Sequence, residues 1–105
     1  MIRIIKPNGE TEQIRQDYPP TYGQLKKWIG CDVIELVKIF YNGKYEYMYV
    51  DEVGAIKKPP LPVNAIATLL YHENARVHQP ELLKNAPSIY GVAVLVTSYH
   101  KEEEN

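Results

Sequence analysis

The sequence lacks most of the residue patterns from which catalytic and metal sites are built. Cys31 is the single cysteine, which excludes an internal disulfide and a metal site made from a cysteine pair. The three histidines, His72, His78 and His100, form no H-E-x-x-H motif. The sequence also has no G-x-S-x-G motif and no glycine-rich phosphate loop. We therefore expect a protein that is not an enzyme, with no catalytic residues, no metal site and no cofactor.

Long apolar runs and a surplus of one charge are missing as well. No stretch approaches the ~20 apolar residues of a membrane helix, and residues 1–6 do not have the pattern of a secretory signal. We therefore expect a cytoplasmic protein without a membrane partner. Twelve basic residues against 13 acidic ones leave a net charge of −1. Nonspecific nucleic-acid binding needs a clear basic surplus, so nucleic acid is not an expected partner.

What is present is the composition of one folded domain. The chain has 105 residues, of which 45% are hydrophobic, and this predicts a single domain over residues 1–100 with a charged tail over 101–105. The pattern predicts an α+β fold: an antiparallel or mixed sheet of about five strands, in the order β-β-α-β-β-α-α-β, with the helices packed on one face. The expected strands are 1–6, 11–15, 32–41, 44–51 and 89–97, and the expected helices are 22–29, 63 to 72 or 73, and 80–84, with a polar link over 74–79.

Two Asn-Gly pairs and one capping pattern carry the firmest local predictions. Asn8-Gly9 and Asn42-Gly43 each separate two extended runs, which is typical of a tight hairpin turn. Thr21 and Gln24 have the spacing of a helix capping box, and Gly30 is placed to end that helix in a left-handed conformation.

The second hairpin has a predictable register. A two-residue turn pairs Tyr41 with Lys44, which places Lys38 opposite Tyr47. One face then carries the tyrosine row, defined here as Tyr45, Tyr47 and Tyr49 with Lys38 beside them; Phe40 and Leu36 lie on the same face. The other face is mostly aliphatic and holds Val33, Glu35, Val37, Ile39, Glu46, Met48 and Val50.

The tyrosine row has three interpretations, which the sequence leaves open. The rings can pack under the helices as part of the core. They can form a homo-oligomer or protein interface, where tyrosine is favoured. They can also stack on the flat ring of a nucleotide whose phosphates Lys38 would hold.

Asn64 is a second candidate, at the start of the main helix. It can act as a helix cap, or it can help the free amides of the first turn to receive an anionic group. Arg76 and the lysines of the proline-rich loop would stand nearby if that loop folds back. The expected ligand-binding residues are therefore Lys38, Tyr45, Tyr47, Tyr49, Asn64 and Arg76.

Three segments together resemble an uncharacterised family of small phage, plasmid and mobile-element proteins, known as a domain of unknown function. In Tyr49–Gly54 an extended segment ends in an acidic pair and a glycine, in Pro62–Ala67 a proline and an asparagine open a helix, and Ile89–Ala93 has a glycine in the last strand. The resemblance covers about the C-terminal two-thirds of the chain. It implies no activity, but it implies a bacterial host and a mobile-element context, in which small proteins are often inhibitors of host defence.

Two functional hypotheses follow. In the first, a homo-oligomer sequesters a nucleotide-derived immune signal in a pocket where tyrosine, lysine and asparagine converge. In the second, the protein inhibits a host defence complex, in an anti-CRISPR-like manner, through a flat and exposed tyrosine-rich face. The lysine in register with the tyrosines favours the first hypothesis.

Overall fold

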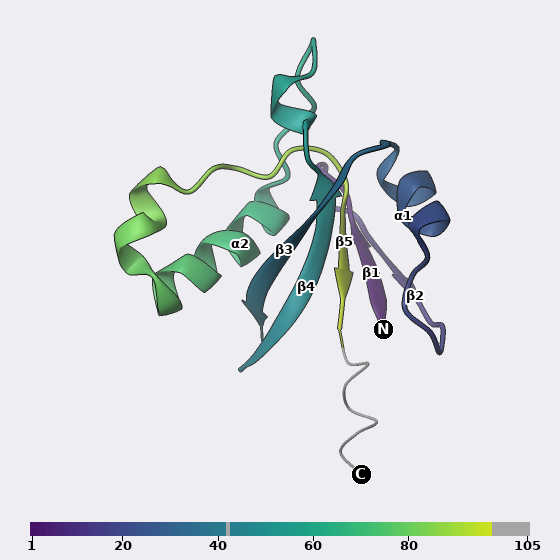
Figure 1. Ribbon diagram of the computed structural model, residues 1–105, viewed down its shortest axis with the longest axis horizontal. Coiled ribbons are helices and arrows are strands. Elements are labelled where there is room, and N and C mark those ends of the chain that lie inside the picture. The colour runs from purple at the N-terminus through teal and green to yellow at the C-terminus, as the bar shows by residue number, and fades with distance from the viewer. Residues whose placement is uncertain (42, 98–105) are drawn as a thin grey trace.

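The computed structural model describes residues 1–41 and 43–97, so Asn42 of the predicted turn and the predicted tail lie outside it. It confirms the α+β class. One antiparallel sheet has the strand order β2-β1-β5-β4-β3 (Figure 1). The strands are β1 Ile2–Ile5, β2 Thr11–Ile14, β3 Ile34–Tyr41, β4 Lys44–Asp51 and β5 Ala93–Val96, the helices are α1 Tyr22–Ile29 and α2 Ala65–His78, and short 3₁₀ helices span Gly54–Ile56 and Pro80–Asn85.

The capping signals around α1 act as predicted. Thr21 Oγ1 accepts a hydrogen bond from the Gln24 backbone N–H at 3.1 Å, and Gln24 Oε1 accepts one from the Thr21 N–H at 3.0 Å. Gly30 ends the helix at φ 78°, where its N–H donates to the Lys26 carbonyl. Local side-chain chemistry therefore determines both ends of this two-turn helix.

The expected bounds of α2 and β5 were wrong. α2 continues to His78 through the segment predicted to be a polar link, because Arg76 pairs with Glu73 one turn earlier and the helix packs along β3. β5 begins only at Ala93. Gly91 before it has φ 85°, and a Cβ there would lie 2.7 Å from Leu61 Cδ1. The positive φ and this close approach interrupt the extended run.

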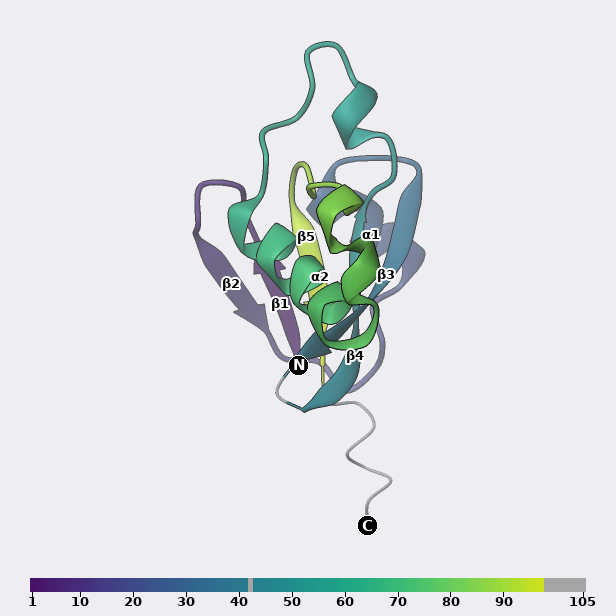
Figure 2. The ribbon, with the colours of Figure 1, turned by 90° about the vertical axis from the view of Figure 1, so that its left-hand side faces the viewer.

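The prediction that the helices share one face of the sheet is also wrong. Figure 2 shows α2 in front of the sheet and α1 behind it. The cause lies in the neighbouring strands β1 and β5, which bury apolar side chains on both faces of the sheet. Ile5 packs in the cluster under α2, whereas Ile4 and Val94 pack in the cluster under α1. A sheet with two apolar faces needs a helix on each.

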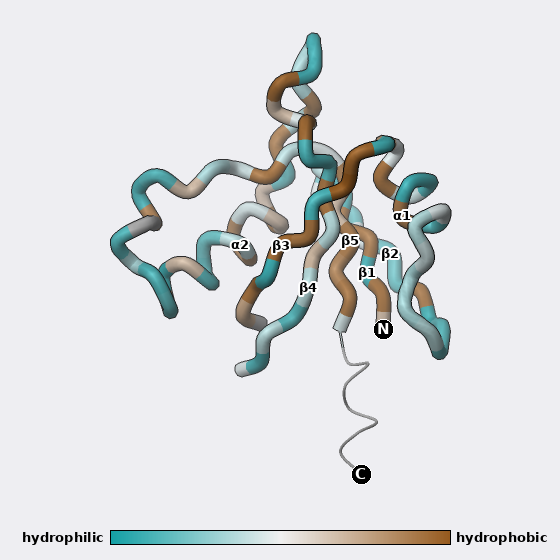
Figure 3. Tube along the Cα trace, in the orientation of Figure 1, coloured by the Kyte–Doolittle hydropathy of each residue, from teal (hydrophilic) through white to brown (hydrophobic). Residues whose placement is uncertain are grey.

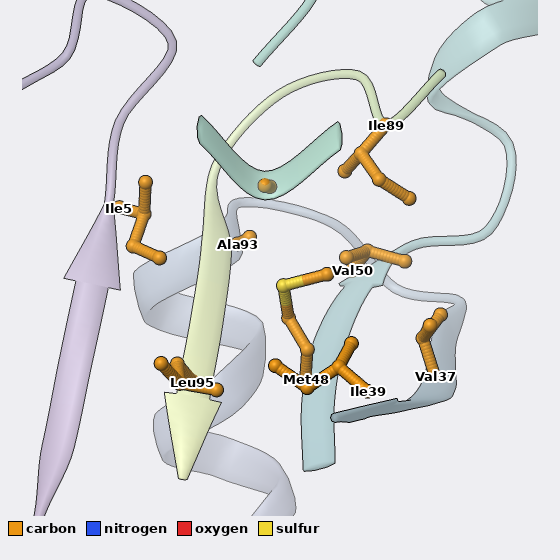
Figure 4. Packing of buried hydrophobic residues seen from close by; sticks show 9 residues of the cluster. Ile5, Val37, Ile39, Met48, Val50, Ile89, Ala93 and Leu95 are labelled. Atoms are coloured by element: carbon orange, nitrogen blue, oxygen red, sulfur yellow. The ribbon is translucent and has the colours of Figure 1, made fainter. Parts of the chain in front are cut away.

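The cluster under α2 has more buried residues than the cluster under α1 and gathers side chains from four strands and the helix (Figure 4). Met48 and Ile39 lie at its centre with no exposed surface. Figure 3 shows the corresponding pattern along the chain, with hydrophobic colours concentrated in β1 and β5 and hydrophilic colours at the far end of α2. The fold is thus held by buried side chains on both sides of the sheet, with more of them on the side that α2 covers.

Candidate functional site

The predicted register of the β3–β4 hairpin is confirmed along its whole length. Tyr41 pairs with Lys44, Lys38 with Tyr47, and Leu36 with Tyr49. The aliphatic face points to α2, where Val37, Ile39, Met48 and Val50 are buried. Val33 is an exception, because it precedes the strand and is exposed.

Two members of the tyrosine row lie open to solvent. Tyr45 is 47% exposed and Tyr47 is 46% exposed, and their neighbour Leu36 is 53% exposed. Tyr49 instead is half-buried against the cluster under α1. The core-packing interpretation is therefore wrong for Tyr45 and Tyr47 and correct for Tyr49, because α1 covers only the part of this face that lies near Tyr49.

Aromatic and cationic groups meet at the hairpin end of the row. Lys38 Nζ lies 4.9 Å from the centroid of the Tyr45 ring, within the range of a cation–π contact. Phe40 meets Tyr45 edge-on at 5.5 Å. His78, the last residue of α2, lies 4.8 Å from the Phe40 ring, and its Nδ1 is 3.2 Å from the Tyr45 hydroxyl. Sequence reasoning missed His78 because it ended the helix near residue 73.

Asn64 does not belong to this face. Its side chain is fully buried, its Nδ2 donates to the Ile5 and Gly91 carbonyls at 2.9 Å each, and its Oδ1 accepts from the Ala67 N–H at 3.1 Å. These bonds use both amide hydrogens and cap α2. The prediction that Asn64 binds a ligand is corrected by this geometry, because the side chain joins the start of α2 to the end of β1 and to Gly91 before β5.

Arg76 and Lys57 are likewise engaged elsewhere. Arg76 Nε donates to Glu73 Oε1 at 3.0 Å, and this hydrogen bond lowers the pKa of Glu73. Lys57 Nζ lies 2.5 Å from the buried carboxylate of Asp51, and the hydrogen bond raises the pKa of Lys57. The hydrogen bonds and ion pairs described for these two side chains go to Glu73 and Asp51 and not to the tyrosine row or Asn64. The predicted ligand set therefore divides into an exposed group (Lys38, Tyr45 and Tyr47) and residues placed elsewhere.

The side chains of the exposed group stand at the molecular surface. Hollows of about 150 and about 230 Å³ occur on the structure. Neither is lined by Lys38, Tyr45, Tyr47 or Asn64. We call the exposed surface formed by Leu36, Lys38, Tyr45 and Tyr47 the open face.

The described part of the chain assembles neither a metal site nor a reactive thiol. Residues 1–41 and 43–97 contain no group of three or more His, Cys, Asp or Glu side chains placed to hold a metal ion. Cys31 is half-buried, and burial raises the pKa of its thiol, which disfavours the reactive thiolate. Among the helices of these residues, none is both long and apolar enough to cross a membrane.

Comparison with known proteins does not help to interpret the open face. No family model, no curated protein and no solved structure matches the chain. The resemblance to phage and mobile-element proteins therefore stays a prediction, and function has to be argued from the geometry of the chain itself.

Proposed function

We propose that the chain is a non-enzymatic binding protein that presents its open face to a protein partner. The observation that carries the proposal is the exposure of Tyr45, Tyr47 and Leu36 on an uncovered part of the sheet. A sheet surface of this kind offers a flat apolar area, and the tyrosine hydroxyls can still form hydrogen bonds at its edge.

The chemistry of the open face matches that of interface centres. Tyrosine supplies a large contact area and fixes only two side-chain torsions, so little conformational entropy is lost when it is buried. The Lys38 ammonium beside Tyr45 adds a charge that can select an acidic patch on the partner. His78 and Phe40 contact the Tyr45 ring, which limits its movement before binding.

The biological setting is part of the proposal and rests on the resemblance of three segments to phage and mobile-element proteins. In that setting the partner is a host defence complex, and the protein acts in the cytoplasm of a bacterial host as its inhibitor. The face itself requires only that the partner has a complementary flat surface.

A second candidate function is sequestration of a nucleotide-derived signal by a homo-oligomer. The observation in its favour is the Lys38–Tyr45 contact, which combines a stacking ring with a positive charge. Because Tyr45 and Tyr47 are each about half exposed, a second copy would have to close over the ligand. The amide of Asn64 is unavailable to that ligand.

Quantitative affinity capture from a host lysate, followed by mass spectrometry, separates these candidates. The native protein, Tyr47→Ala, Tyr47→Phe and Leu69→Ala serve as baits; Leu69 is 69% exposed on α2, away from the open face. A protein partner should be lost with Tyr47→Ala and retained with Leu69→Ala. A small molecule of defined mass, released when the purified protein is denatured, would favour the second candidate. Protein partners captured equally by all four baits, with no small molecule released on denaturation, would contradict both.

A further inference from the structure

A small hollow opens on the side of the sheet that α2 covers, away from the open face. It has a volume of about 150 Å³ and lies between the start of β3, the end of β4, α2 and residues 87–90. Val37, Val50 and Ile89 line it and are buried, so they form its apolar floor. Binding sites for drug-sized molecules usually occupy about 300–1,000 Å³. The hollow therefore suits one small group and not a whole nucleotide.

The rim of this hollow is negatively charged. Glu35 and Glu52 line it, and both are exposed. The ion pairs that the structure describes in residues 1–41 and 43–97 include neither of them. The third carboxylate at the hollow, Asp51, is already bonded to Lys57 and to the Val53 N–H. Among the described residues that line the hollow none is basic, and Lys57 reaches it only through its bond to Asp51.

Two tyrosines complete the lining of the hollow. Tyr71 of α2 and Tyr90 line the hollow beside the carboxylates. A tyrosine ring face attracts a cation, and the attraction grows when the cation is partly removed from water. An apolar floor, an anionic rim and aromatic walls together match a ligand that has an alkyl stem and a positively charged end.

We propose that this hollow binds an alkylguanidinium or alkylammonium group, either as a free small cation or as the side chain of an arginine or lysine. The alkyl stem lies against Val37, Val50 and Ile89. The charged end lies between Glu35 and Glu52. This site is independent of the open face, so the two assignments can fail separately.

A neighbouring hollow bears on the source of the cation. It has a volume of about 230 Å³ and shares Tyr71 and Pro87 with the first. Asn74, Gln79 and Asn85 line it and carry side-chain amides, which can bond the peptide groups on either side of a basic residue. Asn74 Oδ1 is buried and accepts no hydrogen bond in the described part of the chain. A ligand N–H that reached it would satisfy an acceptor that otherwise costs stability.

The test is a titration followed by two-dimensional amide NMR on the whole protein. The probes are agmatine, a capped arginine amide and N-butylurea, an uncharged molecule that has the same four-carbon chain but lacks agmatine's terminal amine. We expect both cations to shift the amide signals of Glu35, Glu52, Ser88 and Tyr90, and we expect butylurea to leave them in place. A capped arginine that binds more tightly than agmatine identifies a peptide source, and the reverse order identifies a free cation.

Three glutamate variants make the test specific. Glu35→Gln and Glu52→Gln should each weaken agmatine about two- to fivefold, the range expected for one exposed charge pair. Glu12→Gln removes an exposed carboxylate from β2, away from the hollow, and should leave the affinity unchanged. Tyr47→Ala should leave it unchanged too. No shift with either cation, equal shifts with butylurea, or an equal loss in Glu12→Gln would overturn the proposal.

Discussion

The two faces of the β3–β4 hairpin come from alternate residues of the same strands, yet they meet different surroundings. On β4, Met48 has no exposed surface, whereas the adjacent Tyr47 is 46% exposed. α2 closes the Met48 face, while α1 reaches only as far as Tyr49 on the other face. Consecutive residues of β4 thus alternate between the buried core, where they stabilise the fold, and the solvent-exposed face.

The largest expected effect is a difference in the free energy of unfolding between substitutions on the two faces. Met48→Ala should lower the free energy of unfolding by about 2–5 kcal/mol, because it leaves a cavity in the core under α2. Tyr47→Ala should cost at most about 1 kcal/mol, the scale of one exposed cross-strand pair. Chemical denaturation of both variants measures the difference. Equal losses would mean that the open face also holds the fold.

Asn64→Ala tests the connection between α2 and the sheet. The substitution removes the donor of two buried backbone carbonyls and the cap of α2, so we expect a loss of about 2–3 kcal/mol in the free energy of unfolding. Asn8→Ala is the matched control, because Asn8 forms one exposed bond to the Glu10 N–H and should cost less than about 1 kcal/mol. Equal denaturation midpoints for the two variants would contradict this structural role of Asn64.

The smallest expected effect concerns α1, which covers the inner part of the face with the tyrosines. Thr21→Ala removes the capping hydroxyl and should lower the free energy of unfolding by about 1 kcal/mol. Thr21→Ser keeps a hydroxyl and should restore most of that loss. Thermal unfolding of both variants distinguishes the cap from a simple change of side-chain volume. A Ser variant as unstable as the Ala variant would contradict the role of the hydroxyl.

Features set by neighbouring residues could be predicted from the sequence. The register of β3 and β4 follows from the Asn-Gly turn, and both ends of α1 follow from Thr21, Gln24 and Gly30. Even the composition of the two hairpin faces follows from alternation. These predictions succeeded because each depends on interactions between residues close together in the chain.

Features set by distant residues could not be predicted. Alternation does not say which hairpin face α2 covers, or that α1 lies on the opposite side of the sheet. The length of α2 depends partly on its packing against β3, and so does the meeting of His78 with Tyr45. The same is true of Asn64, whose partners Ile5 and Gly91 are 59 and 27 residues away. Such contacts belong to the tertiary structure and leave little trace in any single segment.

The most direct test of the open face as a binding surface is the affinity of the captured partner for purified native protein and for Tyr47→Ala. The account predicts a loss of about tenfold or more, as expected when a central interface tyrosine is removed, with an unfolding curve close to that of the native protein. Unchanged affinity in a folded Tyr47→Ala variant would contradict the central claim and place the binding site elsewhere on the molecule.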